Sequence, residues 1–283
     1  MLRIAVQAKG RLFEETMTML SESSIKISSG KRTLLVPASN FPVEILYLRD
    51  DDIPQAVASG IADVGIVGEN EFVERHEKAD LIKRLDFSKC RLSLAIPQLI
   101  DYPGIEWFNG KKIATSYPGI LREWLDENKI NADIHVITGS VEISPNIGLG
   151  DAIFDIVSSG STLVSNRLKE VEVVMKSEAV IIANNDLDAE KQEILDELMF
   201  RFEAVRSAED KKYVMMNVPN ESLDEVLAML PASKAPTVIE LATPGWHAVH
   251  SVISEKLYWE LVGKLKAAGA EGILALNIEK IVM

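Results

Sequence analysis

The chain has 283 residues, of which 47% are hydrophobic and 26% are charged, and its formal net charge at pH 7 is −13. This composition is typical of a globular protein of two or three domains, and its acidity argues against nonspecific binding to nucleic acid or to an anionic membrane. Because no stretch approaches the roughly 18 uninterrupted apolar residues of a membrane span, and the N-terminus leads directly into a strand, we expect neither a span nor a secretory signal.

The small number of cysteine and histidine residues limits which disulfides and metal sites the chain can form. Cys90 is the single cysteine, which excludes an internal disulfide, fits a reducing compartment and predicts a cytoplasmic protein. It lies in an apolar stretch, and we interpret it as a packed core thiol. The four histidines do not have the spacing of a zinc site.

The first predicted unit is a strand over residues 2–6 followed by an amphipathic helix over 12–24. Between them lie Lys9, Gly10 and Arg11. Two cations around a glycine at a strand-to-helix turn indicate either an anion site or an ordinary solvated basic turn.

Further strands are predicted over 33–36, 43–48 and 62–67, and the acidic run after Arg49 lies among them. Asp50 or Asp51 is expected to cap a helix that begins there. Arg49 is a candidate phosphate contact. The strand over 62–67 leads to Glu69, which parallel strand order would bring to the same edge as Lys9.

A second alternation of strands and helices begins with a strand over 91–97. It continues with strands over 112–115 and 134–137 and a helix over about 120–128. Thr115, Ser116 and Tyr117 lie at a strand-to-helix turn. They are candidates for pyrophosphate or nucleotide contact, with Tyr117 as a stacking surface, but Ser116 also suits a helix cap.

A short buried strand over 152–157 ends in a loop of glycine and hydroxyl residues. The loop consists of Ser158, Ser159, Gly160, Ser161 and Thr162. Small residues let the backbone approach an anion, and N–H and hydroxyl groups donate to it, although serine and glycine are also ordinary turn residues.

The acidic residue beside this loop favours a sugar phosphate as the ligand. Asp155 would repel a phosphate, so its carboxylate fits better as an acceptor for the hydroxyls of an attached sugar.

An apolar strand over 177–184 is expected to return to the first unit, so the chain would cross twice between two lobes. This predicts an α/β body of two lobes with a double crossover, as in periplasmic binding proteins. Lobe I comprises 1–95 and 178–207, and lobe II comprises 96–177. We expect Lys9 and Arg11 to oppose the 158–162 loop across the cleft.

After a helix over 187–205, the order of elements changes. Two helices and four strands over 208–283 follow the order βαββαβ, which predicts an α+β, ferredoxin-like third domain. It contains no candidate acid–base set, which alone indicates a dimerisation domain.

Several motifs resemble those of the ATP phosphoribosyltransferase family in its long form, in the same order and over nearly the whole chain. The signature residues are Glu142, Gly148, Gly150, Asp155, Ser158, Gly160, Thr162 and Leu163. The other motifs are K-G-R-L (9–12), R-D-D-D-I-P (49–54), G-I-V-G-E-N (65–70), R-L-D-F (84–87), C-R-L-S-L-A (90–95) and A-T-S-Y-P (114–118).

The resemblance implies transfer of a phosphoribosyl group from phosphoribosyl pyrophosphate to N1 of ATP, the first step of histidine biosynthesis, with Mg²⁺ as cofactor. It also implies that Lys9, Arg11 and Arg49 bind the phosphate groups, and that Asp155 and Glu142 bind the ribose hydroxyls. Glu142 could instead bind the water of a magnesium ion. Glu69 is an implied substrate contact. Because the net charge is negative, the site must be locally basic or depend on a divalent cation.

For the C-terminal domain the resemblance implies an ACT-like module that binds histidine as a feedback inhibitor, with Asn217, Thr237 and Ala275 as effector contacts. It also implies a homo-oligomer, a dimer or hexamer.

Three other readings of the sequence are open. A solute-binding receptor would share the two-lobed fold, and an inactive regulatory subunit would share the C-terminal module. A phosphoribosyltransferase of the common type is disfavoured, because that type carries two adjacent acids where Asp155 stands alone before Ile156.

Overall fold

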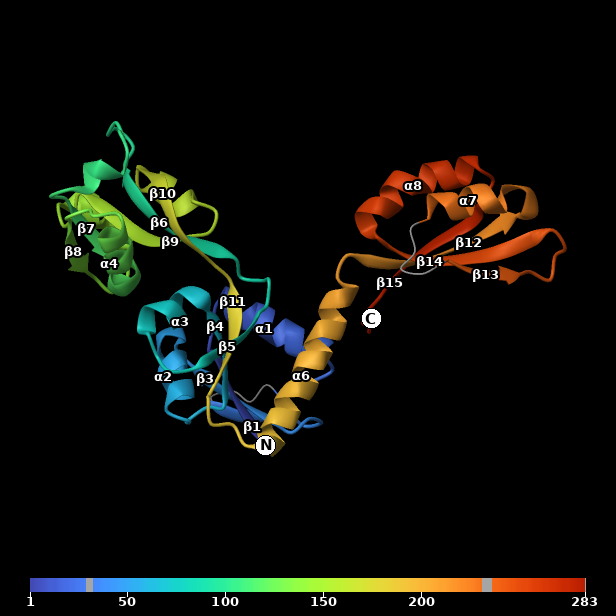
Figure 1. The fold of residues 1–283 in the computed structure, drawn as a ribbon, viewed down its shortest axis with the longest axis horizontal. Helices are drawn as coiled ribbons and strands as arrows, with labels where there is room; N and C mark the ends of the chain where they lie inside the picture. Colours follow the sequence, from blue (N-terminus) through green and yellow to red (C-terminus); the bar gives the residue numbers. More distant parts are fainter. Residues whose placement is uncertain (29–32, 231–235, 283) are drawn as a thin grey trace. The chain divides into compact units, whose positions relative to one another are not determined.

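The computed structural model describes residues 1–28, 33–230 and 236–282. The chain forms two compact units, one of Met1–Ser21 and Ile25–Leu195 and the other of Glu22–Ser24 and Asp196–Met283. The first unit contains two sheets and the second contains one (Figure 1).

The first sheet of the larger unit has six strands in the order β2-β3-β1-β4-β11-β5. β1 is parallel to both β3 and β4, whereas β11 is antiparallel to β4 and β5. The strands are β1 (Leu2–Gln7), β2 (Leu35–Pro37), β3 (Val43–Leu48), β4 (Val64–Gly68), β5 (Asp80–Arg84) and β11 (Ala179–Ala183). The helices of this part are α1 (Arg11–Glu22), α2 (Ile53–Ala58) and α3 (Glu69–Arg75), with a 3-10 turn over Asp50–Asp52.

The second sheet of the larger unit has five strands in the order β10-β6-β9-β7-β8. β7 is parallel to β8 and β9, whereas β6 is antiparallel to β9 and β10. The strands are β6 (Cys90–Pro97), β7 (Lys112–Thr115), β8 (Asp133–Val136), β9 (Ala152–Val157) and β10 (Leu168–Ser177). Helices α4 (Pro118–Glu127) and α5 (Ser161–Ser165) accompany them, with 3-10 turns over Ile105–Phe108 and Val141–Ile147.

Two connections join these sheets. The chain leaves the first sheet between β5 and β6 and returns between β10 and β11, as Figure 1 shows. The predicted double crossover and two-lobed α/β body are therefore confirmed. The exact lobe limits at 95/96, 177/178 and 207/208 remain a prediction.

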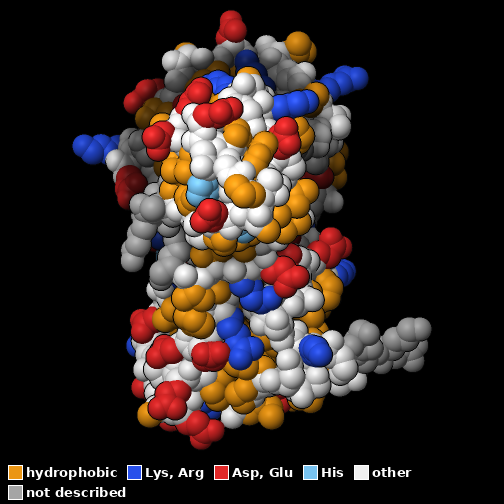
Figure 2. Space-filling view, turned by 90° about the vertical axis from the view of Figure 1, so that its right-hand side faces the viewer, with side chains coloured by type: hydrophobic (Ala, Val, Ile, Leu, Met, Phe, Trp, Pro, Cys, Tyr) orange, Lys and Arg blue, Asp and Glu red, His pale blue; other side chains and the backbone are white. Residues whose placement is uncertain are grey.

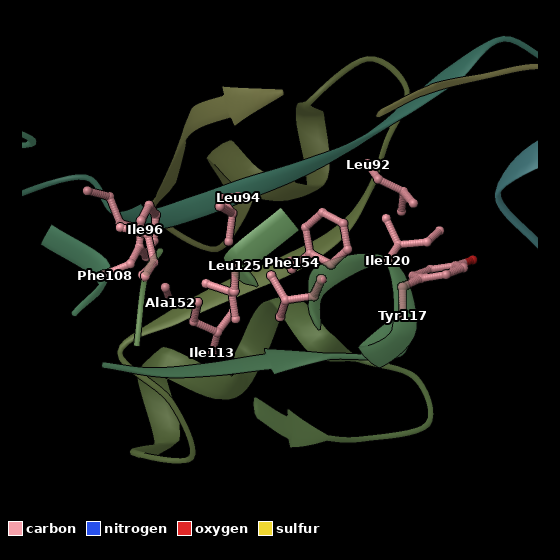
Figure 3. Close-up of a cluster of buried hydrophobic side chains, with 12 residues drawn as sticks. Leu92, Leu94, Ile96, Phe108, Ile113, Tyr117, Ile120, Leu125, Ala152 and Phe154 are labelled. Atoms are coloured by element: carbon pink, nitrogen blue, oxygen red, sulfur yellow. The ribbon is translucent and has the colours of Figure 1, made fainter. Parts of the chain in front are cut away.

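The core of the second lobe lies between its sheet and α4. Leucine and isoleucine side chains of β6 and β7 pack there against Phe108 and Phe154. Figure 3 shows Tyr117 at the edge of this cluster, with its oxygen turned away from the other side chains.

The smaller unit has a four-stranded sheet in the order β13-β14-β12-β15, with α7 and α8 on one face (Figure 1). Val214, Met216, Val249 and Ile253 pack under these helices. The elements are α6 (Ala189–Ala208, which begins in the larger unit), β12 (Lys211–Pro219), α7 (Leu223–Met229), β13 (Thr237–Glu240), β14 (Trp246–Ser254), α8 (Glu255–Ala267) and β15 (Glu271–Asn277), with a 3-10 turn over Asn220–Ser222. This order confirms the predicted βαββαβ module.

Two local predictions were wrong. The acidic run after Arg49 forms a 3-10 turn before α2 in which no side chain accepts a capping hydrogen bond. Cys90 is half-buried and lines a cavity instead of packing in a core.

Candidate active site

Polar residues gather where the parallel strands of the first sheet end. β1 and β3 run in register to Gln7 and Leu48, and the Ala8 N–H donates to the Leu48 carbonyl at 2.9 Å. The turns that follow β1, β3 and β4 therefore share one edge of the sheet. These turns carry Lys9, Arg11, Arg49 and Glu69.

Three of these four side chains already hold an ionic partner. Arg11 pairs with Glu15 at 3.2 Å, and Arg49 pairs with Asp51 at 3.1 Å. Glu69 is buried and accepts two hydrogen bonds from Arg84. Because the Arg11 and Arg49 pairs are exposed, an incoming phosphate can displace the carboxylates at little cost.

The second sheet brings its own set of polar residues to the ends of β7 and β9. Thr115 pairs with Phe154, so Asp155 and the 158–162 loop lie beside the turn that follows β7. A cavity of about 160 Å³ opens here, and its lining includes Glu142, Asp155 and four residues of the loop. The sequence-predicted sugar-phosphate residues are thus brought together in one cavity.

Asp155 is half-buried at the base of this cavity. One carboxylate oxygen accepts the Ile156 N–H at 2.8 Å. Burial raises the pKa of Asp155 to about 6, the Ile156 N–H opposes the rise, and the charge of Glu142 adds to it. The carboxylate is therefore poorly solvated, which favours a ligand that donates hydroxyl groups to it.

The loop contains one residue in a backbone conformation that favours glycine. Gly160 has a φ of +80°, a left-handed conformation that side-chain-bearing residues rarely adopt. The hydroxyls of Ser159 and Ser161 lie 2.9 Å apart in a hydrogen bond, and both side chains are exposed. The loop thus presents hydroxyl groups next to Asp155 without apolar cover.

A larger cavity of about 670 Å³ adjoins the loop where the chain crosses between the sheets. Ser158 lines both cavities. The larger cavity is lined by Arg84, Lys89, Arg91 and Lys176 with two carboxylates, Glu69 and Glu178, and by Cys90 and Ser177. Arg91 is paired with Glu170, so Arg84, Lys89 and Lys176 supply the locally basic surface that an acidic protein needs for anionic substrates.

Two of the three residues predicted to contact substrate at the turn after β7, Thr115 and Tyr117, are buried. Thr115 is fully buried, and its hydroxyl accepts the Tyr117 N–H at 2.8 Å. Tyr117 is only 6% exposed, so its ring offers no face to a ligand here, and its stacking role stays a prediction.

The helix cap at this turn comes from another part of the chain. Ser116 does not cap α4. Instead, the Glu74 carboxylate of α3 accepts the Gly119 N–H at 2.8 Å and the Ile120 N–H at 2.9 Å. A carboxylate at a helix N-terminus is favourable, and this one links the two lobes.

The thiol that lines the larger cavity also has a shifted pKa. Burial raises the pKa of Cys90, and a hydrogen bond with Ser177 and the charge of Arg11 lower it. The predicted approach of Lys9, Arg11 and Arg49 to the 158–162 loop stays a prediction.

Sequence reasoning missed the roles of Arg84, Arg91, Glu71 and Glu74. The two arginines stand in the motifs R-L-D-F and C-R-L-S-L-A, but their partners lie 15 and 79 residues away. The strand that carries Glu170, the partner of Arg91, was not predicted.

The proposed effector residues do not share one face of the C-terminal sheet. Thr237 pairs with His250, and Asn217 pairs with Ala248, which places both on the face opposite α7 and α8. Ala275 pairs with the buried Val214 and so lies on the helix-covered side.

Two features are absent from the described residues. No group of three or more His, Cys, Asp and Glu residues in this part of the chain is arranged to hold a metal ion. Within the same residues, every helix is too short or too polar to cross a membrane.

The sequence matches two protein families. Residues 49–204 match the family described as HisG: ATP phosphoribosyltransferase, and residues 208–280 match HisG, C-terminal domain. An ATP phosphoribosyltransferase of Bacteroides fragilis is 69% identical over 283 residues, all of both chains. One of Cytophaga hutchinsonii is 58% identical over 281 residues, 99% of this chain and 98% of the relative.

Solved structures agree with the fold. The ATP phosphoribosyl transferase (HisG:HisZ) complex from Thermotoga maritima contains a chain that is 25% identical with a TM-score of 0.61, covering 72% of this chain and 99% of that one. The substrate binding protein of an amino acid ABC transporter is 11% identical with a TM-score of 0.50, covering 73% and 93%, and shares the fold alone.

Proposed function

The chain belongs to the ATP phosphoribosyltransferase family, and we propose that it transfers the phosphoribosyl group of phosphoribosyl pyrophosphate to N1 of ATP. Pyrophosphate is released, and the product opens histidine biosynthesis. The observation that carries the site assignment is the cavity in which Asp155 lies beside the hydroxyl-rich 158–162 loop. The loop binds the 5′-phosphate, and Asp155 accepts hydrogen bonds from ribose hydroxyls.

The reaction needs little acid–base chemistry from the protein. Adenine N1 attacks with a free lone pair, the bond from ribose C1 to pyrophosphate oxygen breaks, and positive charge develops on the ribose ring. Positioning and electrostatics therefore carry catalysis. The ionised Asp155, with Glu142 nearby, stabilises that positive charge as well as holding the hydroxyls.

Cations on the other side of the reacting bond take up the charge of the leaving pyrophosphate. Lys9, Arg11 and Arg49 serve this role from the edge of the first sheet. The neighbouring cavity, lined by Arg84 and Lys176, provides space and charge for the nucleotide or the pyrophosphate, and Glu69 lines it as a substrate contact.

Mg²⁺ is proposed to reach the site on substrate phosphate oxygens, which is its common mode in phosphate-transferring enzymes. When bound, the ion would neutralise charge on the pyrophosphate leaving group. Glu142 and Asp155 are the carboxylates of the smaller cavity, and either fits as a ligand to a water of the ion.

Regulation and assembly are assigned to the smaller unit. Histidine binds the sheet face that carries Asn217 and Thr237 and inhibits the enzyme. Ala275 lies on the other face of the sheet, so it would contact histidine only at a separate site.

The sheet face that carries Asn217 and Thr237 also exposes an apolar surface, which favours a homo-oligomer such as a dimer or hexamer. This surface consists of Tyr213, Val252, Leu274 and Leu276. Figure 2 shows one side of the molecule, where hydrophobic side chains reach the surface between acidic ones. A biosynthetic role and a single cysteine favour a cytoplasmic location for the protein.

The test is to mix the purified chain with ATP, Mg²⁺ and phosphoribosyl pyrophosphate and to follow the ultraviolet absorbance change of N1-ribosylation, with and without histidine. Turnover that requires both substrates, and that histidine slows, is expected. Binding of phosphoribosyl pyrophosphate without turnover would favour a receptor of the same fold instead.

A further inference from the structure

Arg91 connects the crossover strand β6 to the first residue of the phosphate loop. Its Nε and Nη2 donate to the two carboxylate oxygens of Glu170, each at 2.5 Å. Its Nη1 donates to the Ser158 carbonyl at 3.0 Å. The buried Ser93 hydroxyl donates to Glu170 at 2.6 Å, so the acceptor carboxylate is itself held in place. A bidentate pair of this kind fixes both the position and the plane of the guanidinium.

The contact with Ser158 determines the orientation of the next peptide group. The Ser158 carbonyl and the Ser159 N–H belong to one planar trans peptide, so they point in opposite directions. Because the carbonyl is held toward Arg91, the Ser159 N–H points away from Arg91. Arg91 lines the larger cavity and Ser159 lines the smaller one, with Ser158 between them. This geometry directs the Ser159 N–H to the side of the smaller cavity.

We infer that Arg91 is a positioning residue that orients the 158–159 peptide for the 5′-phosphate, without touching the substrate itself. The inference rests on the proposed function of the loop. Three of the five N–H groups of Arg91 are already used, and its charge is compensated by Glu170. Its loss should therefore affect the phosphate end of the donor and leave pyrophosphate and ATP binding nearly unchanged.

Arg3 offers a closely matched control in the same unit. It pairs across strands with Glu44, with Nε donating at 2.8 Å, and its Nη1 donates to the Ile61 carbonyl at 3.0 Å. The two arginine side chains are similarly exposed, 38% for Arg3 and 30% for Arg91. Arg3 lies near the start of β1, at the opposite end of that strand from Lys9. Arg3→Gln thus removes an equivalent interaction away from the site.

The experiment compares Arg91→Gln with Arg3→Gln in the full chain. We expect Arg91→Gln to raise the KM for phosphoribosyl pyrophosphate and the inhibition constant of ribose 5-phosphate roughly tenfold, the effect of one lost hydrogen bond to a charged group. The KM for ATP and the inhibition constant of pyrophosphate should change less than about twofold, and Arg3→Gln should leave all four constants unchanged. Arg91→Lys, which keeps the charge but loses the planar fork of donors, should recover part of the affinity.

Three outcomes would overturn the inference. Constants of Arg91→Gln that match those of Arg3→Gln would show that the loop does not depend on Arg91. A parallel rise for pyrophosphate would show direct substrate contact. If Arg91→Gln does not fold, Glu170→Gln carries the test, and an unchanged KM for phosphoribosyl pyrophosphate in that variant contradicts the positioning role. Absence of turnover in the wild-type chain would instead contradict the proposed function.

Discussion

The hydroxyl of Tyr117 donates a hydrogen bond of 2.6 Å to Oε1 of Glu71, and this bond joins the start of α4 in one lobe to α3 in the other. Asn70 donates to the same hydroxyl at 3.1 Å and is bonded to Ser177, the last residue of β10. Burial, and then the charge of Glu71, raises the pKa of Tyr117, so the hydroxyl stays protonated. Burial also raises the pKa of Glu71.

Tyr117→Phe is expected to lower the free energy of unfolding by about 1–3 kcal/mol at pH 8, because the buried Glu71 carboxylate loses its donor. The loss should shrink toward pH 5. Since the pKa of Glu71 is raised, it becomes protonated earlier than an ordinary carboxyl as the pH falls, and no buried charge then needs the hydroxyl. Urea unfolding at both pH values measures this. Tyr258→Phe in the smaller unit is the control, and an equal loss in both variants would contradict the role of the bond.

Asp155→Asn is expected to stabilise the chain while impairing catalysis. The folded pKa of about 6 lies above the ordinary value, so the ionised form is disfavoured in the fold. The free energy of unfolding therefore falls as the pH rises through the interval between the two values and stays lower above it. Removing the charge should restore at most about 3 kcal/mol at pH 8 and little at pH 4.

The melting temperature of Asp155→Asn should thus rise by a few degrees at pH 8, while kcat/KM for phosphoribosyl pyrophosphate falls about tenfold to a hundredfold. Asp126→Asn, on the exposed side of α4, should change neither quantity. A variant of Asp155 that is both less stable at pH 8 and fully active would refute the assignment.

Thr162→Val is expected to raise the KM for phosphoribosyl pyrophosphate about fivefold to tenfold, because one donor to the 5′-phosphate is lost. The KM for ATP should change less than about twofold. Initial rates with each substrate varied in turn provide the measurement. Thr18→Val, the same substitution at an exposed position of α1, serves as the comparison, and equal effects on the two substrates would argue against the loop as the phosphate site.

Cys90 provides a reporter of the larger cavity, because it is the single cysteine of the chain and lines that cavity. Burial raises the pKa of its thiol, so maleimide should react slowly at pH 7 and faster as the pH rises. Saturating ATP or pyrophosphate should slow the reaction several-fold by filling the cavity. Mass spectrometry after timed quenching measures the rate, and modification at an unchanged rate would mean that neither ligand enters there.

The sequence alone predicts the elements whose signals are local. The strand over Ala152–Val157 is correct to the residue, because an apolar run ends there in glycine and serine, whereas the last two residues of the predicted loop, Ser161 and Thr162, begin α5. The strand over Leu168–Ser177 was missed, because its lysine and glutamate residues resemble a solvated surface, yet eight of its ten residues are buried or half-buried. Because that strand was not predicted, the pairing of Glu170 with Arg91 could not be predicted either.

Interactions between distant segments were the least predictable part of the site. Ser116 was a reasonable cap for α4 by sequence, but Glu74 occupies that position from 45 residues away. Likewise, the sequence indicates a stacking surface at Tyr117, but it does not predict that the hydroxyl of this residue donates to Glu71. A local pattern contains neither contact, because each depends on how the two sheets are joined.

The most direct test of the central claim is a crystal structure of the chain with phosphoribosyl pyrophosphate and Mg²⁺. The account predicts the 5′-phosphate in the cavity of the 158–162 loop, ribose hydroxyls within hydrogen-bond distance of Asp155, and the pyrophosphate toward Lys9 and Arg11. Density for the sugar phosphate elsewhere, with the 158–162 loop empty, would contradict it.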